Sequence, residues 1–193
     1  TLRPMAPRLH QGLVARIGLS EVTPDQLRRA HAVHPIWAVE SEYSLWTRDP
    51  ETTGTLAACR ELGVGFVSYS PLGRGFLTGA IRAPEDLAED DNRRRHPRFA
   101  AANFARNLAL ADHVRELARR KGCTPAQLAL AWLLARGEHV IPIPGSTRIE
   151  RVEENAGATR VPLSAEDIRA LDALAPTVAG ERYPEAGMRA VHR

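Results

Sequence analysis

Short apolar runs alternate along the chain with longer, more polar segments that carry helix start and stop residues. The apolar runs predict strands within 13–20, 35–45, 64–70 and 140–144. The other segments predict helices over about 23–33, 51–62, 107–121, 124–135 and 149–157, with a last one from residue 164. This alternation predicts an α/β fold with a parallel sheet that is covered on both faces.

Capping signatures mark the start of several of these helices. Thr23-Pro24-Asp25-Gln26 and Thr124-Pro125-Ala126-Gln127 each combine a Thr N-cap, a Pro at the first helical position and a Gln that closes the capping box. Ser164 and Asp167 form a similar pair, and Gly63 is placed to end the helix over 51–62.

Two segments lack these patterns. Residues 1–11 are basic and interrupted by prolines, so we expect an irregular N-terminal segment there and one folded unit over 12–193. Residues 78–102 are long and irregular and include a charge run at 90–95. We expect a loop region rather than a regular element in this second segment.

Polar and glycine-rich residues follow directly after the predicted strands. They are Ser20 and the ranges 40–43, 69–75 and 145–148. The carboxyl ends of parallel strands lie at one edge of the sheet, and in a (β/α) barrel this edge is the functional face. We therefore expect these four groups to lie on the same face.

Residues 140–158 combine a strand end, a small Gly-Ser-Thr turn and a charged helix. Free backbone N–H groups and the helix dipole converge at such a helix start and attract anions. Arg148 and Arg151 suit a phosphate monoester, which a guanidinium can bind through two hydrogen bonds. The same pattern also fits an ordinary strand–turn–helix junction with a solvated charged face, and the spacing alone leaves both interpretations open.

The composition is that of a soluble globular chain, with 193 residues, 44% hydrophobic and 25% charged. A net charge of +3 and only 5% aromatic residues argue against a nucleic-acid-binding protein. Cys59 and Cys123 match no metal-ligand spacing, so we expect both to be reduced and buried. No apolar run reaches the roughly 18–20 residues of a membrane helix, and no signal peptide is apparent, so we expect a cytoplasmic protein.

Several ordered motifs together resemble the aldo-keto reductase family. The matching segments are Ile17–Glu21 (IGLSE), Ser41–Trp46 (SEYSLW), Ser68–Gly75 (SYSPLGRG), Ala126–Trp132 (AQLALAW), Pro142–Thr147 (PIPGST), Glu153–Asn155 (EEN) and Arg182–Glu185 (RYPE). The resemblance extends from about Gly12 to the C-terminus. It implies a partial (β/α)8 TIM barrel, about strands five to eight with their helices, so that 12–193 would be the C-terminal half of the barrel domain.

The resemblance also implies that the chain binds NADPH at the carboxyl ends of its strands. Ser20 would bind the nicotinamide carboxamide with Glu40 as second partner, and Tyr69 would stack on the nicotinamide ring. The residues implied beside the pyrophosphate are Ser70, Leu72, Gly73, Arg74 and Gly75. Those implied at the adenosine 2′-phosphate are Gly145, Ser146, Thr147 and Arg148, and those bordering the adenine are Arg151, Glu154 and Asn155.

Three positions depart from the family pattern. Glu40 stands where the family usually has Gln, so it keeps an acceptor for the carboxamide but loses the amide donor. A carboxylate there would also attract the cationic, oxidised nicotinamide. Glu21 stands where Asn is frequent, and Thr147 replaces a frequent Lys, which leaves Arg148 as the principal positive charge at the 2′-phosphate.

The catalytic Asp, Tyr, Lys and His of the family belong to the first half of the barrel, which this sequence does not match. Tyr43 and Tyr69 match other positions of the pattern, so no catalytic residue is assigned. The chain is expected to be a cofactor-binding half of an NADPH-dependent aldo-keto reductase, which acts on small carbonyl substrates and is inactive alone. The alternatives are a non-catalytic nucleotide-binding or regulatory module, or an inert truncated fragment.

A half barrel would expose two strand edges and its inner face, so we expect self-association or pairing with another half. The basic run Arg93-Arg94-Arg95 is interpreted as part of a solvated loop, although it also suits an acidic partner. His31 and His34 have no apparent third ligand, so we expect a helix-end pair and no metal site. Trp46 suits either a substrate pocket or packing between loop and barrel. The apolar stripe Leu128, Trp132 and Leu133 predicts core packing.

Overall fold

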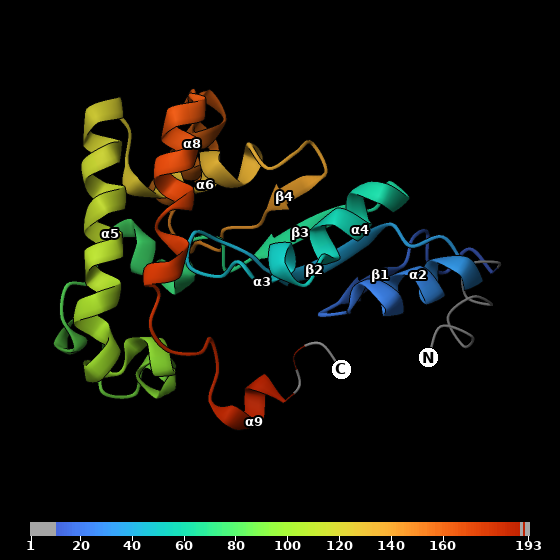
Figure 1. Cartoon of the computed structure of the whole chain (residues 1–193), viewed down its shortest axis with the longest axis horizontal. Helices are drawn as coiled ribbons and strands as arrows, with labels where there is room; N and C mark the ends of the chain where they lie inside the picture. Colours follow the sequence, from blue (N-terminus) through green and yellow to red (C-terminus); the bar gives the residue numbers. More distant parts are fainter. Residues whose placement is uncertain (1–10, 190, 192–193) are drawn as a thin grey trace.

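The computed structural model describes residues 11–189 and residue 191, and it contains one four-stranded sheet. The strands are β1 (Gly18–Ser20), β2 (Ala38–Glu42), β3 (Gly65–Tyr69) and β4 (Val140–Pro142). They lie in the order β1-β2-β3-β4, and each neighbouring pair is parallel (Figure 1). The predicted parallel sheet is therefore confirmed. The predicted irregular segment 1–11 lies, except for Gln11, outside the described residues.

Helices connect the strands and follow the last one. They are α2 (Pro24–Val33), α3 (Asp49–Thr52), α4 (Thr55–Leu62), α5 (Ala101–Lys121), α6 (Pro125–Leu134), α7 (Ile149–Ala156), α8 (Ala165–Asp172) and α9 (Glu185–Met188). Short 3-10 turns occupy much of the stretch from 73 to 99. Figure 1 shows α2 and α4 beside the strands and α5, α6 and α8 grouped at one end of the view.

The predicted capping boxes are all present. Thr23 accepts a hydrogen bond from the Gln26 N–H at 3.2 Å and donates its own N–H to the Gln26 side chain at 2.9 Å. Thr124 starts α6 in the same way, and Ser164 starts α8 with Asp167 as its partner. Each box satisfies backbone N–H groups that have no partner within the helix.

Several element boundaries differ from the prediction. Only Gly18–Ser20 of the run 13–20 pairs as a strand. Gly54, with a φ of 82°, divides the helix predicted over 51–62 into α3 and α4. The helix predicted over about 107–121 begins at Ala101 instead, after Ala100, which provides no side-chain cap that the sequence could reveal.

The core lies against one face of the sheet. Leu128, Trp132 and Leu133 of α6 are fully buried, as predicted, and α6 packs on β4. Alternate strand residues such as Val39, Phe66 and Val140 are buried with them. These side chains form the covered face of the sheet.

The opposite face of the sheet is open in the described part of the chain. Glu40 is exposed, and Ile141 of β4 is 51% exposed. Trp37, just before β2, and Ile143, just after β4, are also exposed. The prediction that both faces are covered is therefore wrong for the residues described, because all the helices that pack on the strands lie on one side.

Candidate nucleotide-binding site

A cavity of about 770 Å³ lies beside the carboxyl ends of β3 and β4. One wall is the loop that follows β3, and the other is the turn after β4 together with α7. Pockets of this volume accommodate small molecules and cofactors. Two segments about seventy positions apart in the sequence thus form one concave site, as expected where parallel strands end at the same edge.

Most of the residues predicted from the two loops line this cavity. They are Ser70, Leu72, Arg74, Gly75, Gly145, Ser146, Arg151, Glu154 and Asn155. Gly73 belongs to the loop after β3 but is buried and does not line the cavity. Thr147 and Arg148 belong to the turn before α7 and are exposed. Ser20, Glu40 and Tyr69 belong to β1, β2 and β3 and do not line the cavity. The structure therefore brings the two loop groups together and places the strand-end group apart.

The loop after β3 has an unusual backbone. Ser70, Gly73, Arg74 and Gly75 have φ angles of 47°, 57°, 56° and 90°. A side chain on Gly73 would lie 2.4 Å from a ring carbon of Trp46, so only glycine lets the loop approach that ring. Such a chain of left-handed residues persists only where surrounding contacts hold it.

The turn after β4 is closed by Ser146. Its hydroxyl accepts the Arg148 N–H at 3.2 Å and donates to the Arg148 carbonyl at 3.1 Å. The helix α7 starts directly afterwards, which confirms the predicted strand–turn–helix arrangement. The Gln127 side chain donates to the Glu154 carbonyl at 3.0 Å and so ties α7 to α6. Arg151, Glu154 and Asn155 are thereby presented to the cavity.

A second group of polar residues lies at the ends of β1, β2 and β3. Ser20 pairs in register with Glu40 across β1 and β2. Beside them, the Glu21 carboxylate accepts hydrogen bonds from Ser41 Oγ, the Glu42 N–H and Tyr69 Oη. These three contacts measure 3.1, 3.0 and 2.8 Å.

Arg182 completes the environment of Glu21. Its terminal nitrogens lie 3.2 and 3.0 Å from the two Glu21 oxygens, and its side chain is 1% exposed. Burial alone would raise the pKa of Glu21, but the hydrogen bonds from Arg182, Glu42 and Tyr69 outweigh it and lower that pKa. Glu21 therefore stays ionised and serves as an anchor for its neighbours.

Tyr69 is held at its hydroxyl end. Besides Glu21, it contacts the Tyr183 hydroxyl at 3.0 Å. Burial and these two partners raise the pKa of Tyr69 above its usual range, so the phenol remains protonated. Burial and Glu51 likewise raise the pKa of Tyr43. Both phenols therefore remain protonated at neutral pH.

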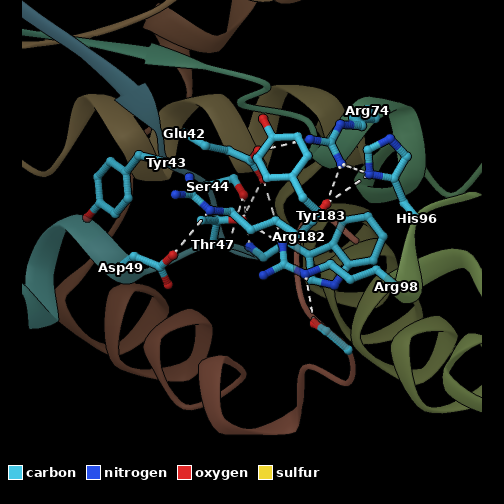
Figure 2. Close-up of polar contacts among 12 residues, drawn as sticks. Glu42, Tyr43, Ser44, Thr47, Asp49, Arg74, His96, Arg98, Arg182 and Tyr183 are labelled. Atoms are coloured by element: carbon cyan, nitrogen blue, oxygen red, sulfur yellow. Dashed lines mark hydrogen bonds and ion pairs between the residues drawn. The ribbon is translucent and has the colours of Figure 1, made fainter. Parts of the chain in front are cut away.

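A buried cluster around Glu42 links the strand ends to the C-terminal tail (Figure 2). The Glu42 carboxylate accepts from Arg74 at 3.0 Å and from Thr47 at 2.8 Å. Arg98 lies 3.8 Å from the same carboxylate, and Arg182 also pairs with Asp49 at 3.3 Å. In Figure 2 Arg182 lies between the acidic residues on one side and Arg74 and Arg98 on the other.

Some residues of the cavity and one partner of Glu21 were not predicted from the sequence. Thr78, Ile81, Asp86 and Ala126 line the cavity, and so does Arg93 of the basic run. Except for Ala126 of α6, these residues come from a segment without regular periodicity, so no sequence signal placed them at the cavity. The motif 182–185 was noted, but its contact with Glu21 could not be foreseen because the two positions are far apart in the chain.

Two side chains of the basic run 93–95 form hydrogen bonds within the protein. Arg93 bonds to Asp91 and to the Arg74 carbonyl, and Arg94 bonds to the carbonyls of Leu87 and Ala88. The run lies in a short 3-10 turn, and the interpretation as a solvated loop is wrong for these two side chains, because they are hydrogen-bonded to the protein.

The remaining candidates from the sequence are structural. Trp46 is 3% exposed and packs against Phe76 and Phe99, which favours packing over a substrate pocket. His31 and His34 lie at the end of α2, as predicted. Among the described residues, no group of three or more His, Cys, Asp or Glu side chains is arranged to hold a metal.

The two cysteines differ in their surroundings. Cys59 is fully buried, and burial raises the pKa of its thiol to about 12. Cys123 is only half-buried, so the prediction that both are buried is wrong for Cys123. Within the part of the chain that the structure describes, every helix is too short or too polar to cross a bilayer.

Comparison with known proteins identifies the family. The aldo/keto reductase family model matches residues 7–176, and the chain belongs to this family. It is 47% identical over 185 residues to probable aldo-keto reductase 1 of Glycine max, a match that covers 95% of this chain and 53% of that protein.

Two solved structures show the same fold. A thermostable aldo-keto reductase solved with the inhibitor epalrestat superposes with a TM-score of 0.69 at 32% identity, over 90% of this chain and 53% of that one. A glycerol dehydrogenase from Gluconobacter oxydans superposes with a TM-score of 0.79 at 27% identity, over 86% and 51% of the two chains. The chain thus spans about half the length of these relatives.

Proposed function

We propose that this chain is the cofactor-binding, C-terminal half of an NADPH-dependent aldo-keto reductase, with β1–β4 corresponding to strands five to eight of the barrel. The parent reaction is reversible hydride transfer between NADPH and an aldehyde or ketone. NADPH supplies the hydride, and the residues of this chain bind and orient the cofactor. Family membership and the four parallel strands support this assignment.

The observation that carries the proposal is the cavity between the loop after β3 and the turn before α7. It joins Gly75 and Arg93 on one wall to Ser146 and Arg151 on the other. Glycine backbone and guanidinium groups suit the phosphates of a dinucleotide, and Asn155 offers an amide to an adenine edge. The cavity therefore fits the adenosine and phosphate part of the cofactor.

The nicotinamide end of the cofactor would lie toward Ser20, Glu40 and Tyr69. Ser20 and Glu40 are neighbours in register and both are exposed on the open face of the sheet. Tyr69 is half-buried and held by Glu21, so its ring is pre-oriented for stacking. These contacts support the roles expected for the three residues.

Fluorescence titration of the purified chain with NADPH and with NADH tests the proposal. Saturable binding that favours NADPH is expected, because Ser146 and the exposed Arg148 lie beside the predicted position of the 2′-phosphate. An absence of binding to both nucleotides would contradict the proposal that this half keeps its cofactor site.

A second candidate is a non-catalytic nucleotide-binding module. It is favoured by the cavity itself, which would hold a nucleotide whether or not a carbonyl is reduced beside it. An assay of aldehyde reduction by NADPH distinguishes the two candidate functions. The chain alone is expected to bind the cofactor without reducing carbonyls. Measurable turnover would contradict the non-catalytic module and would show that the chain contains catalytic residues.

We also propose that the chain associates with another chain through the open face of its sheet. Ile141 and Ile143 expose apolar surface at β4, which is an unpaired edge of the sheet. Exposed apolar patches and unpaired strand edges favour pairing with another chain. We expect concentration-dependent association in sedimentation experiments, and a monodisperse, cooperatively melting monomer would contradict it.

A further inference from the structure

The C-terminal tail contains a short segment fixed at both ends, residues 179–183, which we call the strap. At its start, the amide of Asn107 on α5 accepts the Ala179 N–H at 2.8 Å and donates to the Ala179 carbonyl at 2.9 Å. Arg98 donates to the Gly180 carbonyl at 3.2 Å. Asn107 is fully buried and Arg98 is 7% exposed, so this end is anchored in the interior.

The other end of the strap is anchored at the strand ends. Arg182 pairs with Glu21 and Asp49, and Tyr183 contacts the hydroxyl of Tyr69. Arg182 is 1% exposed, which makes it one of the most buried large side chains of the chain. A buried ion pair of this kind fixes geometry, because each charge left alone in the interior would be strongly unfavourable.

Arg74 joins the strap to the cavity. Its guanidinium donates to the Arg182 carbonyl at 3.0 Å and to Glu42 at 3.0 Å, and it contacts His96 at 3.1 Å (Figure 2). The same guanidinium lies 4.8 Å from the centre of the Tyr183 ring. Arg74 belongs to the cavity wall, whereas Arg182 and Tyr183 do not line the cavity.

The wall that Arg74 belongs to needs such support. Arg74 and Ser70 are non-glycine residues with positive φ, a conformation that costs free energy. The Arg74 carbonyl is also held, by Arg93 at 2.8 Å. Both terminal guanidinium nitrogens of Arg74 form hydrogen bonds within the protein. Their partners are Glu42, His96 and the Arg182 carbonyl of the strap.

We propose that the strap positions the nucleotide-binding loop through Arg74, so that Arg74 is a positioning residue and not a phosphate ligand. This proposal rests on the proposed function of the cavity as a nucleotide site. Loss of the strap contacts releases the loop from its left-handed conformation and weakens binding from a distance. Tyr183 therefore controls a site that it does not line.

Amide hydrogen exchange in the nucleotide-free chain tests the loop directly. The reporters are the N–H groups of Gly75, Leu77 and Gly79, whose hydrogen bonds close the loop. Arg74→Met removes the polar contacts and is expected to speed their exchange at least about tenfold, with a smaller increase in Tyr183→Leu. Tyr183→Phe keeps the ring beneath Arg74 but loses the hydroxyl contact with Tyr69, so its exchange rate is expected to lie between those of wild type and Tyr183→Leu.

Thr23→Ala is the matched stability control, because it removes the cap of α2 without touching the loop or the strap. Unchanged loop exchange in Arg74→Met and Tyr183→Leu would overturn the proposal. An equal increase in Thr23→Ala would also overturn it, because the effect would then follow from general destabilisation.

A binding experiment with adenosine 2′,5′-bisphosphate separates this proposal from the proposed function. Tyr183→Leu is expected to weaken binding about three- to tenfold and Tyr183→Phe by less, whereas Thr23→Ala keeps wild-type affinity. If the wild-type chain binds no nucleotide but the exchange results hold, the proposed function fails and the positioning of the loop stands. Wild-type affinity in Tyr183→Leu would overturn the coupling to binding.

Discussion

The hydroxyl of Tyr69 donates a hydrogen bond to the carboxylate of Glu21, with 2.8 Å between the two oxygens. Tyr69 ends β3 and Glu21 directly follows β1, so the bond spans β2, which lies between them in the sheet. Glu21 is in turn fixed by Arg182. The orientation of the Tyr69 ring is therefore set by a residue from another strand and by the C-terminal tail.

Two substitutions at Tyr69 distinguish the contribution of its ring to cofactor binding from that of its hydroxyl. Tyr69→Phe keeps the stacking surface and is expected to bind NADPH within about twofold of wild type while losing about 1 kcal/mol of stability. Tyr69→Ala is expected to weaken NADPH roughly tenfold. Calorimetric titration with NADPH and with adenosine 2′,5′-bisphosphate checks this. Equal losses for both ligands in Tyr69→Ala would show that the ring does not contact the nicotinamide.

Replacement of Glu40 by Gln tests the effect of its charge. Glu40 is exposed beside Ser20 and stands where the family usually has Gln. A carboxylate near the nicotinamide favours the cationic oxidised form, so Glu40→Gln is expected to reduce the preference for NADP⁺ over NADPH by roughly threefold. Dissociation constants for both redox forms give this ratio. A ratio equal to that of wild type would place Glu40 away from the nicotinamide.

Arg148 is expected to decide between NADPH and NADH. It is 61% exposed and lies 3.6 Å from Glu150, so it is available at the start of α7. Arg148→Ala is expected to weaken NADPH roughly tenfold and to leave NADH unchanged. Arg169→Ala, the same charge change on α8, serves as the control in these titrations. If both variants weaken NADPH equally, the effect is one of net charge.

Asp167 makes stability depend on pH in the acid range. Its carboxylate lies 2.6 Å from the Lys121 ammonium and accepts the Ser164 N–H at 2.8 Å, and these contacts lower the pKa of Asp167 to about 2. A carboxyl with a lowered pKa in the folded state contributes stability above its ordinary pKa of 3.8 and loses it as the pH falls to about 2.

Urea unfolding of wild type and Asp167→Asn checks this dependence. The variant is expected to be about 1 kcal/mol less stable at pH 7, because it loses the charged cap of α8. The difference is expected to shrink as the pH falls toward about 2. A difference that is constant across this range would mean that ionisation of Asp167 does not stabilise the fold.

Ile141→Lys tests the proposed association through the open sheet face. Ile141 is 51% exposed on β4, at an edge of the sheet. A lysine there is expected to reduce association in sedimentation velocity, because edge charges block strand pairing. Val33→Lys places the same change on the exposed end of α2 and serves as the control. Equal association of both variants and wild type would exclude this face.

Local signals predicted much of the fold. The capping boxes at Thr23, Thr124 and Ser164 use contacts between residues three apart, so a short window of sequence contains all the information. The strand positions also followed from apolar runs. The start of α5 was misplaced because its N-cap is Ala100, which has no side chain that could form a capping hydrogen bond, so no local signal marks it.

The two sites were predictable to different degrees. The cavity residues Gly145, Ser146 and Arg151 follow a recognisable turn, so their clustering could be expected from the sequence. The partners of Glu21 and Glu42 could not, because Arg182 of the tail and Arg98, just before α5, are both far from them in the sequence. The same distance in sequence explains why the contact between Arg74 and the Arg182 carbonyl was not predicted.

The ion pair between Arg182 and Glu21 has a consequence for biosynthesis. Its partners are 161 positions apart, so it cannot form until nearly all of the described chain has left the ribosome. Regions made early fold first, and contacts of long sequence separation form late. The support that we propose the tail gives to the loop beside the cavity is therefore complete only after translation has passed Arg182.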